Sequence, residues 1–386
     1  MREYLIYTQS LENFIIDLSS YVLILVTLLF LLLKKYIDRK LFIFFSIYSL
    51  TPFFFNDILF SSDQMWDQYT NSYYLIDLRN HVFTGNYFDN YFDNFNPNKI
   101  KFIVASHLYG LMPFPYIVSI NTIAFMNKLL ICLTSIYLLK KNYIRKPHLF
   151  FLLLFPSSII YSSLSLKEFF LGITCIWIFL FLYEKKYLYA SLLLIICFFI
   201  RPLFYTFVTG FIFYYFISLR LFLYKSIYIF FNFFILIVII FFSDVLLTKM
   251  NYLIKVYNQE DVGWGGILNQ QNISFINFSL DSILINFKII INKLILNWPV
   301  PLKFKVLFLF ENMILFYFIT KNFKHDYNRN KLQTILSIFY LIFILSCFNI
   351  IFPNLLPLHR YLYPYICFYL FFSKFRPNNE NYSYNK

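Results

Sequence analysis

The sequence predicts an all-α, polytopic integral membrane protein with about eleven transmembrane helices. Of its 386 residues, 60% are hydrophobic and only 13% are charged, whereas a soluble chain carries about a quarter charged residues. The apolar residues also form long runs, and the connections leave no room for a cytoplasmic catalytic domain. We therefore expect one transmembrane domain over residues 1–376 and a polar, disordered cytoplasmic tail over 377–386.

Each expected span is an apolar run that can cross a bilayer, some of them tilted or partly re-entrant. The first run, about 14–33, starts too late and is too long for a signal peptide, and no small-residue cleavage site follows it, so we expect a retained span. The later runs lie at about 41–57, 116–139, 149–165, 169–183, 187–200, 203–219, 226–243, 303–320, 332–352 and 361–373.

Basic residues predict the orientation, because cytoplasmic loops of membrane proteins are rich in Lys and Arg. More than half of the 33 basic residues fall in short connections and the tail. These connections lie near residues 34–40, 140–146, 185–186, 220–225 and 321–331. With these on the inside, two long loops, about 58–115 and 244–302, lie outside, and any chemistry is expected on the extracytoplasmic face.

Several function classes are excluded by what the sequence lacks. The short basic loops hold no glycine-rich nucleotide-binding motif, which excludes a nucleotide-driven pump and a nucleotide-sugar enzyme. The five cysteines lie inside apolar runs without metal-ligand spacing, so neither a metal site nor a cofactor is expected. The formal charge of +14 is explained by basic residues in the cytoplasmic connections, so no nucleic-acid partner is expected.

The first long loop is predicted to begin with an amphipathic helix on the outer membrane surface. Ser61 and Gln64 form a capping-box pattern, and hydrophobic residues repeat every fourth position from Met65. The helix is expected over about 62–83, ended by Thr84-Gly85.

Two acids, Asp63 and Asp67, share one face of this predicted helix. A carboxylate at the rim of a low-dielectric cavity is suited to take a proton from an attacking hydroxyl. The alternative is that both acids are solvated charges favoured by the helix dipole.

Charged residues interrupt the apolar runs at three further places, all at predicted outer ends. These places hold Lys167 with Glu168, then Arg201, then His359 with Arg360 and Tyr361. Cations near hydrocarbon are costly unless they are paired. Either they pair with nearby acids and lipid headgroups, as Lys167 could with Glu168 or Glu311, or they bind a lipid phosphate or diphosphate. Lys128 falls in the middle of a predicted span and has no clear place in this scheme.

The order of these motifs resembles bacterial GT-C-type glycosyltransferases and the Wzy-like O-antigen and capsule polymerases. The matching segments, within residues 60–370, are the acidic loop from Ser62, Phe155-Pro156-Ser157-Ser158 with the break ending at Lys167-Glu168, Ile200-Arg201-Pro202, Asn297-Trp298-Pro299-Val300-Pro301 and His359-Arg360-Tyr361. Such enzymes use sugars carried on polyprenyl phosphate or diphosphate and work on the periplasmic side. This chain departs from the GT-C pattern in having an extra short span before the acidic loop.

The resemblance implies roles for the singled-out residues. Asp63 would be the base and Asp67 a second acid, and the three cations would hold the lipid-linked phosphate. The implied substrate-binding residues are Lys167, Glu168, Arg201, His359, Arg360 and Tyr361.

The expected function is that of a glycosyltransferase of the bacterial inner membrane: a polymerase that joins undecaprenyl-diphosphate-linked oligosaccharide repeat units at the periplasmic face. Its expected partners are that lipid-linked oligosaccharide and membrane lipids, with a chain-length regulator as a further candidate. Two alternatives stay open: a GT-C glycosyltransferase that uses a polyprenyl-phosphate sugar, and a flippase for lipid-linked oligosaccharide.

Overall fold

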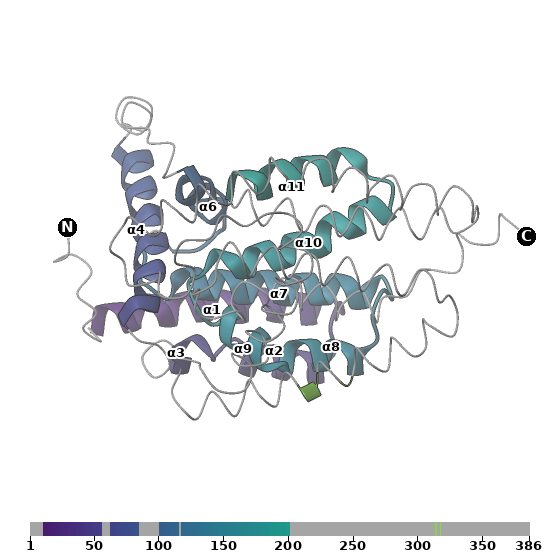
Figure 1. Ribbon diagram of the computed structural model, residues 1–386. Coiled ribbons are helices and arrows are strands. Elements are labelled where there is room, and N and C mark those ends of the chain that lie inside the picture. Colours follow the sequence, from purple (N-terminus) through teal and green to yellow (C-terminus); the bar gives the residue numbers. More distant parts are fainter. Residues whose placement is uncertain are drawn as a thin grey trace, which may run out of the picture. The chain divides into compact units, whose positions relative to one another are not determined.

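The computed structural model describes residues 11–55, 62–84, 100–115 and 117–200, with three isolated helical residues at 313, 314 and 317. The chain divides into two compact units, one formed by Met1–Val208 with His359–Lys386 and the other by Thr209–Leu358. Almost all described residues belong to the first unit, and the fold below is that of this unit (Figure 1).

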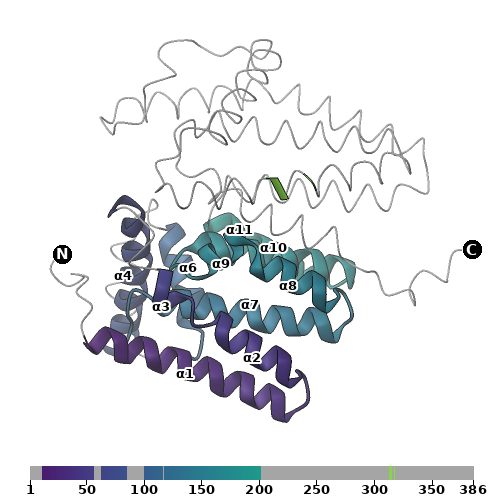
Figure 2. The same ribbon diagram turned by 90° about the horizontal axis from the view of Figure 1, so that it is seen from below.

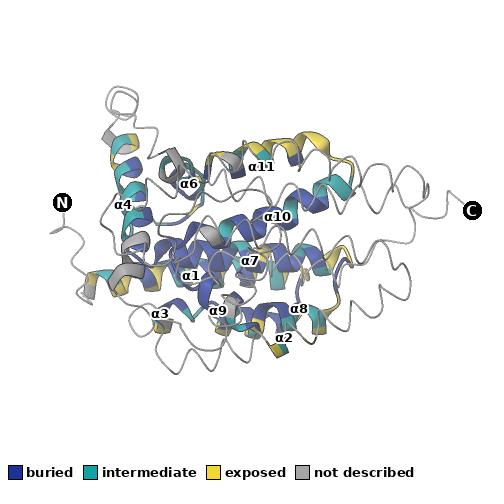
Figure 3. Cartoon of the chain, viewed as in Figure 1, coloured by how far each residue is buried: buried dark blue, intermediate teal, exposed yellow. Residues whose placement is uncertain are grey.

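The described part of the chain is entirely helical, without a strand. Its helices are α1 (Leu11–Leu33), α2 (Arg39–Tyr48), α3 (Pro52–Phe55), α4 (Ser62–Thr84), α6 (Ile100–Gly110), α7 (Thr122–Lys140), α8 (Lys146–Leu154), α9 (Pro156–Ser162), α10 (Lys167–Tyr183) and α11 (Tyr187–Ile200). Helix α7 is the most thoroughly buried of the long helices and contacts α1, α9 and α10 (Figure 3).

Two of these helices, α1 and α7, are long and apolar enough to cross a membrane. Helix α1 exposes an apolar stripe at regular helical spacing, which includes Leu18, Val22 and Leu29. Its buried side holds Asp17 and Ser20 among apolar residues. Helices on the surface of a soluble protein show the opposite arrangement, with the polar residues outside. The exposed stripe therefore suits hydrocarbon better than water.

Two predicted spans are broken by proline. The run 41–57 forms α2, which ends at Tyr48, and the short α3, which begins at Pro52. The run 149–165 forms α8 and α9, which meet at Phe155-Pro156. A proline ring forces the preceding residue out of the α region, and Phe155 is extended with φ −61° and ψ 131°. Each of these two apolar runs is therefore divided between two shorter helices.

The remaining described spans agree with the predicted runs in position. Helix α1 covers the run 14–33, α10 covers 169–183 and α11 covers 187–200. Helix α7 begins at Thr122, several residues later than the run 116–139 predicts. Apart from the helical residues 313, 314 and 317 in the run 303–320, the five predicted spans from residue 203 onward lie outside the described residues, as do the loop 244–302 and the tail from 377.

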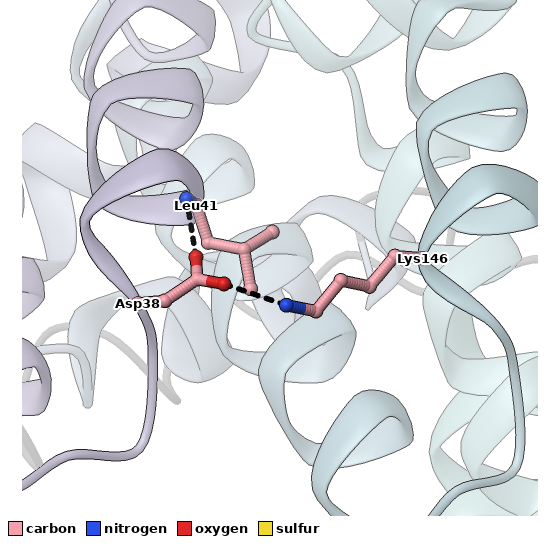
Figure 4. Close-up of polar contacts among 3 residues, drawn as sticks. All are labelled: Asp38, Leu41 and Lys146. Atoms are coloured by element: carbon pink, nitrogen blue, oxygen red, sulfur yellow. Dashed lines mark hydrogen bonds and ion pairs between the residues drawn. The ribbon is translucent and has the colours of Figure 1, made fainter.

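Three basic connections lie at one end of the described helices, as Figures 1 and 2 show for the α1–α2, α7–α8 and α10–α11 turns. The carboxylate of Asp38 in the first turn pairs with Lys146 at the start of α8, with 2.6 Å between Oδ2 and Nζ (Figure 4). Asp38 also caps α2 by accepting a hydrogen bond from the Leu41 amide. At the other end, α4 lies across the ends of the bundle helices (Figures 1 and 2).

Candidate functional site: the helix break before α10

Of the charged breaks predicted from the sequence, the one that the structure describes lies between α9 and α10. Helix α9 ends at Ser162, residues 163–166 are not helical, and α10 begins at Lys167. Buried peptide groups in such a segment lack their helical partners and must be satisfied by other groups.

Side chains of α4 and α7 satisfy this segment. The Ser165 amide donates to Gln68 Oε1 at 3.0 Å, and Asn71 Nδ2 donates to the Ser165 carbonyl at 3.0 Å. From α7, Asn127 Nδ2 donates to the Leu164 carbonyl at 3.1 Å. The break is therefore held in place by three buried amide side chains.

The carbonyls of the break fix the orientation of the Asn127 amide. The Leu164 and Leu166 carbonyls can only accept, so the NH₂ group of Asn127 faces the break. The amide oxygen therefore faces the Tyr109 hydroxyl on α6, which donates to it at 2.8 Å. Both Tyr109 and Asn127 are fully buried, which makes each unmade bond costly.

The hydroxyl of Ser165 ties the break to the start of α7. It donates to the Ile120 carbonyl and accepts from the Ala124 amide at 3.3 Å. Ser72 of α4 also donates to the Ile120 carbonyl, at 3.2 Å. The break, the start of α7 and the middle of α4 thus form one hydrogen-bonded unit.

Lys167 is the first residue of α10 and is only 6% exposed. The N-terminus of a helix already carries a positive partial charge, and a lysine there adds a full one. The residue before it, Leu166, provides no side-chain cap for the amides of the first turn. A cation at a helix start, where the preceding residue supplies no side-chain cap, is suited to an anionic group such as a phosphate.

A second cation lies beside the break. Lys128 of α7 is completely buried, and its Nζ donates to Ser162 Oγ at 2.6 Å. The same ammonium lies 3.7 Å from the ring centroid of Tyr48, whose hydroxyl is 2.9 Å from Ser162 Oγ. Within the described ranges, no carboxylate forms an ion pair with Lys128. The structure thus places this residue in the interior, which the sequence left open.

Helix α4 has nearly the predicted bounds. The apolar face toward the membrane, predicted from the spacing after Met65, stays a prediction. The face that packs against the rest of the protein holds Leu75 and Leu78 together with polar side chains, namely Gln68, Asn71, Ser72 and Arg79, which donates to the Pro115 carbonyl. Each of these polar side chains bonds a backbone group of a segment distant in sequence, at residue 115, 120 or 165.

The other predicted site residues are described only in part. Asp63 and Asp67 lie four residues apart within α4, and Glu168 is the second residue of α10, but their side chains lie outside the described part. The predicted substrate-binding residues Arg201, His359, Arg360 and Tyr361 lie outside the described residues altogether.

Sequence reasoning missed one buried acid near this end of the bundle. Asp17 of α1 is 5% exposed and accepts hydrogen bonds from Ser119 Oγ and, at 2.8 Å, from Asn121 Nδ2. These two residues lie just before α7. The signal was present in the sequence, since an acid inside an apolar run requires a partner.

No protein-family model, curated protein or solved structure matches this chain. Among the described residues, no group of three or more His, Cys, Asp or Glu residues could hold a metal ion.

Proposed function

We propose that this chain is a surface-polysaccharide polymerase of the O-antigen type. In this proposal it is a multi-pass protein of the bacterial inner membrane with about eleven spans, and it joins undecaprenyl-diphosphate-linked oligosaccharide repeat units at the extracytoplasmic face. The observation that supports it best is the buried Lys167 at an uncapped helix start, at the end of the bundle opposite the basic turns. Such a site suits a lipid diphosphate.

The proposed reaction transfers a growing glycan from its diphosphate carrier to a hydroxyl of the next repeat unit. The bond between the anomeric carbon and the diphosphate oxygen breaks, and a new glycosidic bond forms to the acceptor oxygen. Negative charge then builds up on the leaving diphosphate, where Lys167, Arg201 and Arg360 would stabilise it. Asp63 would take the proton of the acceptor hydroxyl, with Asp67 as a second acid.

The residues that flank these cations would orient the substrate. His359 and Tyr361 would donate hydrogen bonds to the sugar or the diphosphate. Glu168, next to Lys167, would accept from a sugar hydroxyl or balance the charge of its neighbour. The polar clamp by Gln68, Asn71 and Asn127 would keep the start of α10 rigid, because a transition state is stabilised only by groups that are already in place.

A flippase for lipid-linked oligosaccharide is the second candidate, and Lys128 is the observation that favours it. Intramembrane ionisable residues commonly mark transport pathways, and Lys128 lies inside α7 instead of at its end. Lys167 favours the polymerase, because it lies at a helix start at one end of the bundle, where a cation suits a lipid diphosphate.

The phenotype of a deletion strain separates these functions. We expect the deletion to leave lipid A-core that carries a single repeat unit, because the first unit is still transferred when polymerisation fails. Loss of even the single-unit band would indicate a flippase or an earlier glycosyltransferase instead. An unchanged lipopolysaccharide ladder in the deletion strain would refute the proposal.

A further inference from the structure

The three basic turns share one local structure. The second residue after each of the helices α1, α7 and α10 has a positive φ: Lys35 at 58°, Asn142 at 56° and Lys185 at 61°. In each turn the amide of the following residue returns to a carbonyl five positions earlier, at 2.7–2.9 Å. This is the Schellman arrangement, which usually employs glycine, because other residues adopt positive φ at a cost. Here two of the three positions are lysine.

Side-chain contacts hold the three turns together at one end of the bundle. The first two turns are joined by the ion pair of Asp38 with Lys146 (Figure 4), and by Lys140 Nζ, which lies 3.8 Å from the ring centroid of Tyr36. The second and third turns are joined by Tyr143, whose hydroxyl donates to Glu184 Oε1 at 2.8 Å. The basic residues of the three turns therefore form one surface, which we call the basic end.

The basic end has a large excess of positive charge. Residues 34–40, 140–146 and 184–186 contain ten Lys and Arg residues, all of them exposed, and two acids. Both acids already have partners, because Asp38 pairs with Lys146 and Glu184 pairs with Lys186 at 2.6 Å. The remaining cations of these turns form no ion pair among the described residues.

Exposed aromatic and apolar side chains border these cations. Tyr36, Tyr187 and Tyr189 are 46%, 49% and 56% exposed, and Leu33 and Leu188 are exposed even further. Tyrosine next to lysine at the ends of apolar helices is typical of the interface between lipid headgroups and hydrocarbon. A nucleic acid or an acidic protein would account for the charge but not for the exposed leucines.

We propose that the basic end binds the headgroups of anionic phospholipids. The ammonium and guanidinium groups would contact lipid phosphates, while the tyrosines and leucines would lie at the level of the upper acyl chains. This binding needs only that α1, α7 and α10 stand in a membrane, so it does not depend on glycosyl transfer. A failed polymerase test would leave the phospholipid-binding proposal intact, and a failed lipid-binding test would leave the polymerase proposal intact.

The test uses the full-length protein, incubated with an equimolar mixture of phosphatidylglycerol and phosphatidylcholine in detergent. Lipid that stays with the protein after repurification is quantified by mass spectrometry. We expect phosphatidylglycerol to be enriched, and the enrichment to fall about threefold in K34Q/K35Q/K140Q/K141Q. The matched variant K34R/K35R/K140R/K141R keeps the charge and should keep the enrichment.

Equal amounts of the two lipids on the wild-type protein would overturn the proposal, as would equal enrichment in the wild type and the Gln variant. Circular dichroism of each variant checks that the helices are intact. If the Gln variant does not fold, the wild-type protein decides: raising the salt from about 0.1 M to about 0.5 M should reduce the enrichment, because salt screens exposed charges. Enrichment that does not change with salt would contradict binding by the basic end.

Discussion

At the scale of single residues, the break before α10 depends on a few buried polar side chains that replace missing backbone bonds. Asn127 serves three partners at once, since it bonds the Leu164 and Leu166 carbonyls at 3.1 and 3.4 Å and accepts from Tyr109. Lys128, the next residue, donates to the Ser162 hydroxyl and lies over the Tyr48 ring. Replacing Asn127 therefore removes more hydrogen bonds than replacing Lys128.

Replacing Asn127 by Leu should destabilise the protein strongly. The change removes the buried hydrogen bonds of Asn127 to the Leu164 carbonyl, which keeps its bond from the Leu166 amide at 2.8 Å, and to the Tyr109 hydroxyl. Each lost buried hydrogen bond costs about 0.5–1.5 kcal/mol. Thermal unfolding in detergent measures the effect. Ser191→Ala is the control: its exposed hydroxyl bonds only the Tyr187 carbonyl, so its removal should change stability by less than about 0.5 kcal/mol. Equal effects of the two changes would contradict the clamp.

Replacing Lys128 by Met should leave stability unchanged or raise it. Methionine has a similar length, its burial carries no charge penalty, and Ser162 Oγ keeps its contact with Tyr48 and its bond to the Ile159 carbonyl. Lys128→Ala leaves a cavity instead and should be less stable than Lys128→Met by about 2–5 kcal/mol. The same unfolding measurement compares the two. A Met variant clearly less stable than the wild type would show that the Lys128 amine itself stabilises the fold.

At the scale of elements, local chemistry determined what could be predicted. The capping pattern at Ser61 and Gln64 gave α4 nearly its observed bounds, Ser62–Thr84. The lysine-rich turns were predicted as connections and form three similar helix ends. The break at Pro156 was missed because the prediction followed hydrophobicity, although proline marks it in the sequence.

The polar clamp could not be predicted in the same way, because its partners are distant in sequence. Gln68 bonds residue 165 and Asp17 bonds residues 119 and 121, so no local pattern links them. Lys167 was singled out as a charge that interrupts an apolar run, which is a local signal. The structure places it at the start of α10. The predicted roles of Asp63 and Asp67 remain predictions.

The two acids of the basic turns, Asp38 and Glu184, determine how these turns contribute to stability at different pH values. The hydrogen bond from Lys146 and that from the Leu41 amide lower the pKa of Asp38. For Glu184, burial raises the pKa, but hydrogen bonds from Lys186, Tyr137 and Tyr143 outweigh it, so the net shift is downward. A lowered pKa in the folded state gives stability that is present above the ordinary value and lost as the pH falls through the folded-state value.

We therefore expect the thermal midpoint of the wild type to fall when the pH drops below the ordinary Glu value of 4.5. The thermal midpoint of Glu184→Gln should fall less over the same pH range, because the glutamine side chain does not titrate. Thermal scans at a series of pH values, with Ser191→Ala as the unshifted control, measure this. Parallel curves for the wild type and Glu184→Gln would contradict the contribution of Glu184.

At the scale of the whole molecule, the proposed function requires the basic turns and the break before α10 to lie on opposite sides of a membrane. Leu111 follows α6 at the end near α4, and Leu188 borders the basic end; they are 84% and 70% exposed. In whole cells, a membrane-impermeant maleimide should label Leu111→Cys and should label Leu188→Cys only after permeabilisation. Labelling of both variants in intact cells would contradict this orientation.

The central claim is that positive charge at the start of α10 serves glycan polymerisation. The most direct measurement is the lipopolysaccharide ladder of a deletion strain that expresses Lys167→Arg or Lys167→Met at equal protein levels. We predict that Lys167→Arg restores the ladder at least in part, because it keeps the cation, whereas Lys167→Met leaves only the single-unit band. A full ladder with Lys167→Met would contradict the claim.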